Sequence, residues 1–116
     1  MIRIEIPLKV DKKYGMNEIY AGIHWTKRQA QAKEIHELMY YSMMAQKVPK
    51  KLFERPVMIS ISFNDNLDCD NHGYITKMLV DGLKGYLIVD DKRKYVTEIR
   101  QKFHDGKDII IEITEV

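Results

Sequence analysis

The strongest constraint on the fold is a change in the spacing of apolar residues between two neighbouring segments. The stretch VMISISF (residues 57–63) has an apolar residue at every second position, which is the period of a half-buried strand. The stretch from Asn71 to Leu83 instead has apolar residues three or four positions apart, which is the period of an amphipathic helix. The stretch NDNLDCDN between them is rich in Asn and Asp, which favour turns over continued pairing. A strand, a turn and a helix in succession predict an α+β domain.

Further patterns extend this prediction along the chain. IRIEI (residues 2–6) alternates as a strand does, and Thr26 is the predicted N-cap of a helix over residues 27–47. Residues 8–25 contain two glycines and predict a long, partly irregular connection. Near the C-terminus, two strand-like stretches flank HDGK, in which Asp105-Gly106 is a strong hairpin signal.

The chain length of 116 residues predicts one small domain over residues 1–116, because two independent cores would not fit. We expect a mixed or antiparallel sheet packed by two main helices. No apolar run approaches the roughly 18–20 residues that span a bilayer, and the N-terminal MIRIEIPLKV alternates where a signal peptide has a continuous apolar core. We therefore expect a cytoplasmic protein with no membrane partner. Cys69 is the only cysteine, which excludes an internal disulfide and a multi-cysteine zinc site.

Four carboxylates flank the second predicted helix. Asp68 and Asp70 precede it, and in an extended segment their side chains point to the same side because side chains alternate. Two hard oxygen ligands held in this way suit Mg²⁺, which favours carboxylates, waters and phosphate oxygens. A third carboxylate from Asp90 or Asp91, brought back by the helix, would complete a site for phosphodiester hydrolysis.

Basic residues supply the complementary part of such a site. Lys77 lies on the predicted helix, where its ammonium could stabilise phosphate charge without competing for the metal. The net charge of +2 gives weak support for a polyanionic partner, so the distribution of charge matters more. Two clusters are candidate DNA-binding residues: Lys50, Lys51 and Arg55, and Lys92, Arg93 and Lys94.

Each feature also has an ordinary structural explanation. Asp-x-Asp often forms a turn or a helix cap, and a basic cluster is often a solvated surface. Trp25, Tyr40 and Tyr41 could stack on DNA, although packing is the favoured interpretation. The histidines are scattered without a ligand pattern, and His72 is the one nearest to the acids.

Taken in order, these residues resemble the RusA-like Holliday junction resolvases. The family pattern is an aspartate, one intervening residue, Asp-Asn, a helix with a lysine and an Asp-Gly-Leu turn, and then Asp-Asp before a strand. The corresponding residues are Asp68-Cys69-Asp70-Asn71, Lys77, Asp81-Gly82-Leu83 and Asp90-Asp91. The similarity covers the second half of the chain, through the closing IIIEITEV. It departs from the best-known pattern in one respect, since Lys77 follows Asn71 by six positions instead of three. Three extra helical residues add about 4.5 Å, nearly one turn, so the lysine could keep its face.

The resemblance implies a RusA-like fold, a homodimer and a need for Mg²⁺, with Mn²⁺ as a substitute. Asp68, Asp70 and Asp91 would bind the metal, and Lys77 would be the catalytic lysine. The implied activity is that of an endodeoxyribonuclease of phage or prophage type, which hydrolyses phosphodiesters in DNA recombination and repair. It would resolve four-way DNA junctions by paired symmetric nicks.

Two supporting residues and two other functions stay open. Asn71 could orient Asp70 or cap the following helix, and the cap is favoured. Asp90 could be a turn residue or a hydrogen-bond partner of a metal ligand. A broader nuclease for branched DNA would use the same acids. A non-catalytic DNA-binding or phage assembly module would use the basic clusters and keep the acids as structural caps.

Overall fold

The apolar alternation along the chain forms a four-stranded sheet. The computed structural model describes residues 1–22 and 24–116. The strands are β1 (Ile2–Ile6), β2 (Val57–Phe63), β3 (Val96–Phe103) and β4 (Ile109–Glu115). The predicted strands at residues 2–6 and 57–63 are therefore confirmed.

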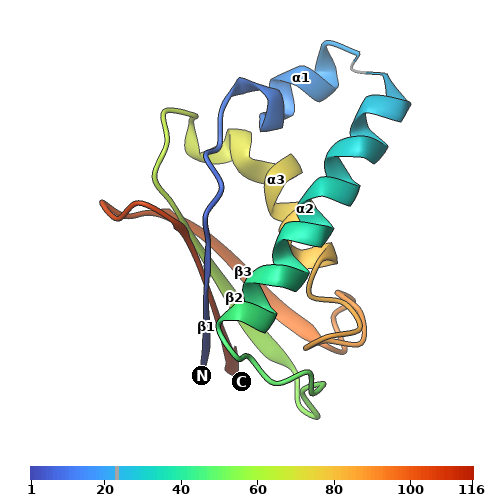
Figure 1. The fold of residues 1–116 in the computed structure, drawn as a ribbon, viewed down its shortest axis with the longest axis vertical. Coiled ribbons are helices and arrows are strands. Elements are labelled where there is room, and N and C mark those ends of the chain that lie inside the picture. The colour runs from blue at the N-terminus through green and yellow to red at the C-terminus, as the bar shows by residue number, and fades with distance from the viewer. Residues whose placement is uncertain (23) are drawn as a thin grey trace.

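Three α-helices lie beside this sheet (Figure 1). They are α1 (Met16–Tyr20), α2 (Trp25–Ala45) and α3 (Gly73–Asp81), with the short 3-10 helices η1 (Lys12–Tyr14) and η2 (Cys69–His72). The connection over residues 8–25 is thus more ordered than predicted, since it contains η1 and α1. Among the described residues, no helix is both long and apolar enough to cross a membrane.

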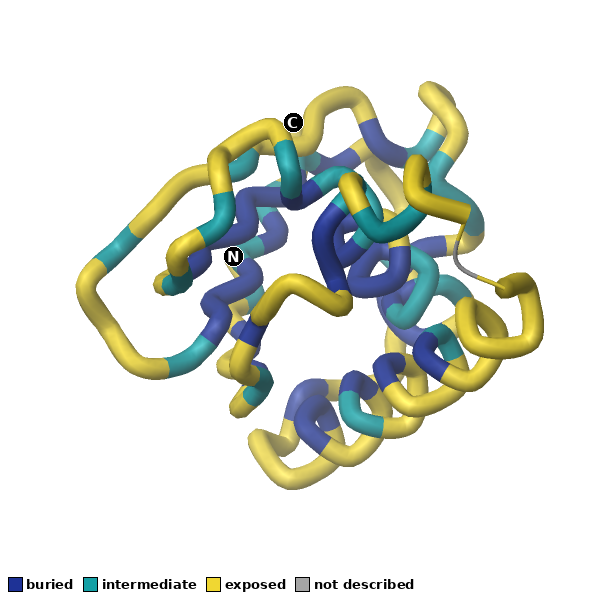
Figure 2. Tube along the Cα trace, turned by 90° about the horizontal axis from the view of Figure 1, so that it is seen from above, coloured by how far each residue is buried: buried dark blue, intermediate teal, exposed yellow. Residues whose placement is uncertain are grey.

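The core lies between the helices and one face of the sheet. In β1 burial alternates, since Ile4 and Ile6 are buried whereas Arg3 and Glu5 are exposed. The central strand β2 is buried on both faces, because Ser60 and Ser62 are buried as well as its alternating apolar residues. In Figure 2 the buried positions of the long helix α2 lie on the side that faces the rest of the molecule. A mixed sheet packed on one side by two main helices confirms the predicted α+β class.

The helix stripes pack as their spacing predicts. Residues Ile75, Met78, Leu79 and Leu83 of the second stripe are all buried. In α2 the predicted face is buried at Ile35, Met39, Ser42 and Met43, and Leu38 is half-buried.

The N-cap of α2 differs from the prediction. The helix begins at Trp25, and His24 Nδ1 accepts a hydrogen bond from the Thr26 N–H at 3.2 Å. His24 is therefore the N-cap, because an imidazole nitrogen can accept this bond as a hydroxyl oxygen does.

The strand order is β1-β4-β2-β3, so the predicted C-terminal hairpin is wrong. β4 pairs antiparallel with β1 and β2, and β3 pairs only with β2, in parallel, from Val57↔Val96 to Phe63↔Phe103. The Asp105-Gly106 turn thus joins two strands that have β2 between them. A parallel pair needs a crossover connection, and α3 provides it. The turn signal is local and does not report which strand lies alongside.

This topology sets the two ends of the molecule (Figure 1). At one end, β2 and β3 finish at the paired residues Phe63 and Phe103. At the other end lie the loop of residues 46–56, the loop of residues 82–95 and both chain termini. Residues that follow β2 and residues that precede β3 are therefore placed at opposite ends of the sheet.

Candidate acidic site and basic clusters

The residues that connect β2 to α3 form a compact acidic loop, and we call residues 64–72 the acid loop. Its entry is a turn in which Asp65 Oδ1 accepts a hydrogen bond from the Leu67 N–H at 2.9 Å. Its exit is η2, in which the Asn71 N–H donates to the carbonyl oxygen of Asp68 at 2.9 Å. The loop presents Asp68, Cys69 and Asp70 to solvent.

Asp68 and Asp70 do not lie in an extended segment, as alternation had predicted. Asp68 is extended (φ −61°, ψ 150°), but Asp70 already belongs to η2, so the two residues differ in backbone conformation. Both side chains are exposed, and neither takes part in an ion pair among the described residues. Each of the two carboxylates is therefore accessible to a cation from solvent.

A buried contact between His72 and Asp65 closes the base of the acid loop. His72 Nε2 lies 2.9 Å and 2.8 Å from the two carboxylate oxygens of Asp65. The side chains of His72 and Asp65 are 1% and 3% exposed. On its other edge, His72 Nδ1 donates to the carbonyl oxygen of Asp68 at 2.8 Å and also lies 3.1 Å from that of Cys69. Sequence reasoning missed Asp65 as the partner of His72, although both residues lie in the same loop.

Asn71 has a structural role that differs from the one favoured. Its side-chain Oδ1 accepts a hydrogen bond from the Asn17 N–H at 3.1 Å, at the start of α1. The following helix, α3, has no side-chain cap hydrogen bond. A Cβ on Gly15 would lie 2.9 Å from Asn71 Nδ2, so the absence of a side chain at Gly15 permits this approach. Asn71 thus ties α1 to the acid loop.

The second acidic pair lies in a separate ion-pair cluster around Lys84. The Lys84 Nζ is 2.8 Å from Asp81, 3.5 Å from Asp90 and 3.3 Å from Asp91. The adjacent Asp81 carboxylate, above all, raises the pKa of Lys84. The Asp91 N–H donates to Asp90 Oδ1 at 2.8 Å, and this bond is the main reason that the pKa of Asp90 is lowered. Sequence reasoning missed Lys84, although its position three residues after Asp81 is an ion-pair spacing.

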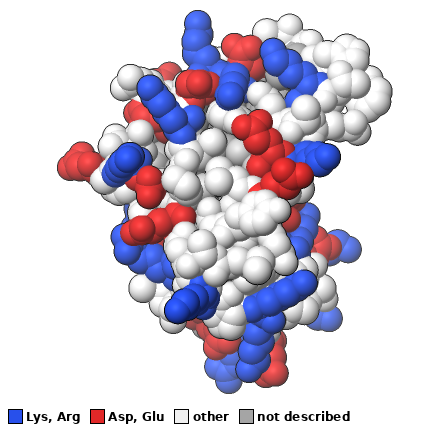
Figure 3. All heavy atoms as spheres, viewed as in Figure 1, with Lys and Arg blue, Asp and Glu red and all other residues white. Residues whose placement is uncertain are grey.

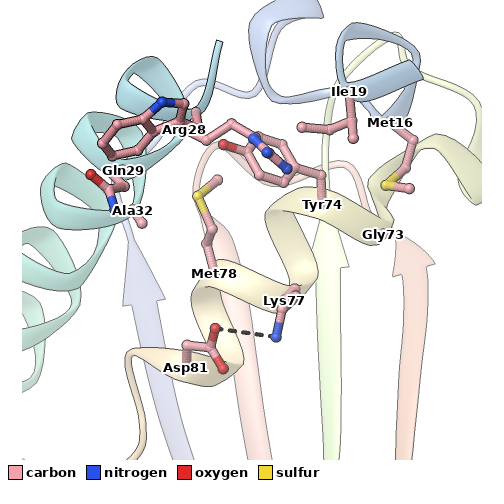
Figure 4. A pocket seen from close by; sticks show the side chains of 11 residues that line it. Met16, Ile19, Arg28, Gln29, Ala32, Gly73, Tyr74, Lys77, Met78 and Asp81 are labelled. Atoms are coloured by element: carbon pink, nitrogen blue, oxygen red, sulfur yellow. Dashed lines mark ion pairs between the residues drawn. The ribbon is translucent and has the colours of Figure 1, made fainter. Parts of the chain in front are cut away.

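The predicted catalytic lysine lies between these two groups. Lys77 is in the middle of α3, with a side chain that is 70% exposed and an Nζ that is 3.5 Å from Asp81 (Figure 4). Its ammonium group is therefore accessible to a ligand. Its only ion pair among the described residues is this one-turn contact, which is weak at an exposed position.

The structure does not bring Asp68, Asp70 and Asp91 together. The two groups lie at opposite ends of α3, whose nine residues span about 13.5 Å. The described residues contain no group of three or more His, Cys, Asp or Glu side chains that could hold a metal ion. The cause is the parallel pairing of β2 and β3, which separates the residues after β2 from those before β3. The expected three-acid cluster is thus replaced by an exposed pair and a lysine-bound pair.

The basic clusters lie at the same end of the molecule as Asp90 and Asp91, and the acid loop lies at the opposite end. The first cluster lies in the loop before β2 and the second in the loop before β3, and all six side chains are exposed. In Figure 3 Lys and Arg side chains gather at the lower end, with acidic side chains among them. The acid loop itself borders a cavity of about 520 Å³, whose lining includes Lys9 and Lys12. These two lysines were missed because they are distant in sequence.

A second cavity, of about 590 Å³, opens beside Lys77 between α1, α2 and α3. Figure 4 shows Arg28 of α2 and Tyr74 and Met78 of α3 directed into the space between α2 and α3. The lining also includes Trp25, the only tryptophan. Burial raises the pKa of Tyr74, and its hydroxyl donates to Gln31 Oε1 at 2.6 Å.

Comparison with known proteins does not assign the chain to a family. No family model matches it, and no curated protein matches its sequence.

Proposed function

We propose that the protein is a metal-dependent endodeoxyribonuclease that resolves four-way DNA junctions by paired nicks. The observation that supports this most is the acid loop, which holds two exposed carboxylates that have no ion-pair partner among residues 1–22 and 24–116. The loop is held by the buried pair of Asp65 and His72. The ordered resemblance to RusA-like resolvases adds the substrate class, and it is the reason to prefer a four-way junction over other branched DNA.

The donor set of the acid loop fits Mg²⁺, with Mn²⁺ as a substitute. Asp68 and Asp70 offer hard oxygen ligands, and Mg²⁺ in nucleotide-processing sites is commonly held by one or two carboxylates plus substrate phosphates and waters. When bound, the ion supplies a Lewis acid that polarises the phosphoryl group. A phosphate would therefore complete the ligand set that two protein carboxylates begin.

Other residues of the chain would hold the DNA. In this proposal Lys77 faces the phosphate or the departing oxygen with an accessible ammonium group. Lys9 and Lys12 lie beside the acid loop, where they can contact strand phosphates. The two exposed basic clusters would hold an arm of the junction roughly 20 Å away, at the other end of β2, a distance set by its seven residues. Such contacts position DNA without reading its sequence.

Asp91 enters the proposal through the resemblance alone, because Lys84 holds it at the other end of α3. The homodimer also comes from the resemblance. A two-fold dimer presents two identical sites, as paired nicks in two opposed strands require.

The test is strand-resolved cleavage of a mobile four-way junction, beside linear duplex, flap and three-way DNA, with Mg²⁺, Mn²⁺ or EDTA. Symmetric nicks confined to the four-way junction, dependent on metal and lost in Asp68→Asn and Asp70→Asn, are expected. The matched control is Asp105→Asn, an exposed aspartate of the turn between β3 and β4. An Asp91→Asn variant tests the resemblance, which predicts a loss as large as that of Asp70→Asn.

A non-catalytic DNA-binding module is the second candidate. The observation that favours it is the ion pairing of Asp91 with Lys84, at the end that carries the basic clusters. Junction binding without cleavage in either metal, unchanged by Asp70→Asn, would select this candidate. Equal cutting of every branched substrate would select the broader nuclease.

A further inference from the structure

We propose that Asp65 and His72 form a buried clamp that positions the carboxylates of Asp68 and Asp70, so that both are positioning residues of the metal site. This inference rests on the function proposed above. It concerns residues that neither the Asp-x-Asp pattern nor the basic clusters include.

The hydrogen bonds of the imidazole define the clamp. Carbonyl oxygens only accept hydrogen bonds, so the nitrogen that faces Asp68 and Cys69 must carry a proton. The opposite nitrogen faces both oxygens of the Asp65 carboxylate. Both edges of the ring are therefore used. His72 has no free nitrogen for substrate or metal, and its role is to hold the backbone of the loop.

Aromatic packing fixes the plane of the imidazole. The ring centroid of Phe63 lies 4.3 Å from that of His72, and the ring of Phe103 meets it edge-on at 5.5 Å. Phe63 and Phe103 are the paired last residues of β2 and β3. The clamp thus packs against the end of the sheet.

The clamp closes the loop on which the two acids lie. Asp65 and His72 are seven positions apart, and between them lie Asp68 and Asp70. The carbonyl oxygen of Asp68 is held directly by His72, which limits rotation of the backbone that carries its carboxylate. Hydrogen-bond partners behind metal ligands commonly matter for metal affinity nearly as much as the ligands do.

The experiment compares Asp65→Asn and His72→Gln with two matched controls. Asp11→Asn is the control for Asp65→Asn, because Asp11 also accepts a hydrogen bond from the N–H two residues later, at 3.1 Å. Asparagine keeps the oxygen that accepts this hydrogen bond at both positions, so Asp65→Asn removes only the second carboxylate oxygen that faces His72. His104→Gln is the control for His72→Gln, because His104 bonds the carbonyl oxygen of Asp108 at 2.8 Å, in another turn.

Three measurements are made on the full chain. Hydrogen exchange of the Asn71 N–H reports the order of the loop, and exchange at Ile59 and Ile61 of β2 reports whether the variant is folded. Broadening of amide signals by Mn²⁺ reports metal affinity without any need for cleavage. Junction cleavage gives kcat and KM.

The clamp predicts faster exchange at Asn71 with unchanged protection of β2 in both clamp variants. It also predicts a loss of roughly 10–100-fold in Mn²⁺ affinity and in kcat, with KM for the junction little changed. The double variant should lose no more than the worse single variant, since the two residues act as one unit. The controls should match the wild type.

Two results would overturn the inference, and they differ from a failure of the proposed function. Unchanged exchange at Asn71 in both variants would show that the pair does not order the loop. Faster exchange with wild-type Mn²⁺ affinity and kcat would show that loop order does not serve the metal site. If the wild-type protein neither binds Mn²⁺ nor cuts DNA, the proposed function fails first and the inference falls with it.

Discussion

The Nζ of Lys84 lies 3.3 Å from Asp91 Oδ1, so a carboxylate that the sequence pattern assigns to a metal is held by an ammonium group. The same ammonium group contacts Asp81 and Asp90. One lysine thus offsets the repulsion among three carboxylates that the end of α3 and the following loop bring together. These ion pairs link the end of α3 to the loop before β3.

Lys84→Met should lower the free energy of unfolding by about 1 kcal/mol, because it leaves three neighbouring carboxylates without their cation. Urea unfolding measures the change. Lys77→Met is the matched control, since Lys77 has one contact of 3.5 Å and a largely exposed side chain. Its cost should stay below about 0.5 kcal/mol. Equal costs for the two variants would contradict the central place of Lys84.

The same cluster predicts the pH dependence of stability. The pKa of Lys84 is raised from its usual 10.5 by the Asp81 carboxylate, so its contribution is complete below that pH and is lost as the pH rises through the higher folded-state pKa. Melting temperatures of the wild type and Lys84→Met should therefore converge on the alkaline side. If the difference in melting temperature between the wild type and Lys84→Met stays constant as the pH rises above 10.5, the stabilising role given to the Lys84 ammonium group is wrong.

Asp90 acts on the acid side. Its pKa is lowered from 3.8, chiefly by the hydrogen bond from the Asp91 N–H, so its contribution is present above that pH and is lost as the pH falls through the lower folded-state pKa. Because the main cause is a backbone donor, most of this acid-side loss should persist in Lys84→Met. Asp90→Asn should remove it, as thermal unfolding between neutral and acid pH would show.

The buried pair of Asp65 and His72 predicts a large stability effect apart from any chemistry. Asp65→Ala leaves the Nε2 atom of His72 without a partner in a site where the His72 and Asp65 side chains are 1% and 3% exposed. Removal of one partner from a buried ion pair typically costs about 3–5 kcal/mol. Urea unfolding of Asp65→Ala beside Asp11→Ala checks this, since Asp11 makes a similar turn without a buried partner. If Asp65→Ala lowers the free energy of unfolding by less than Asp11→Ala does, Asp65 and His72 do not form a buried ion pair.

The local patterns of the sequence predicted much of this fold. The alternation at residues 57–63 predicted a strand, and the stripe that includes Ile75 and Leu79 predicted the buried face of a helix. The alternation did not predict that β2 is central and buried on both faces, with Ser60 and Ser62 inside. The strand order could not be predicted in the same way. The turn at Asp105-Gly106 is compatible with a hairpin of β3 and β4. This hairpin is excluded only because β2 lies between the two strands and pairs with both.

The candidate site shows the same division. The acids at positions 68 and 70 were predicted as a pair from their spacing. Both are exposed, but they do not lie in the extended segment that this prediction assumed. The partners of Asn71 and Asp91 were not predictable, because Asn17 is distant in sequence and Lys84 binds the carboxylate that the pattern assigns to a metal. Residue types within one segment suggest chemistry, whereas the contacts between segments decide which groups are free to perform it.

The contact between Asn71 and Asn17 predicts a local effect on α1. Asn71→Ala removes the side-chain acceptor at the start of this five-residue helix, and loss of such a cap costs about 1 kcal/mol. Hydrogen exchange should rise in α1 and remain unchanged in α2. Asn66→Ala, an exposed asparagine of the same loop, is the control. A rise confined to α3 would instead support the helix cap that the sequence favoured.

The position of the basic clusters predicts how DNA binding depends on salt. Each phosphate contact contributes about 0.9 to the slope of log affinity against log salt concentration. The triple change of Lys50, Lys51 and Arg55 to Gln should therefore reduce this slope and weaken binding to every DNA to a similar degree. The Lys9→Gln, Lys12→Gln pair should lower affinity for junction over duplex, because these lysines lie beside the acid loop where the strands would be cut. Fluorescence anisotropy over a salt series separates the two effects. A slope unchanged by the triple change would mean that DNA does not contact the end with the basic clusters.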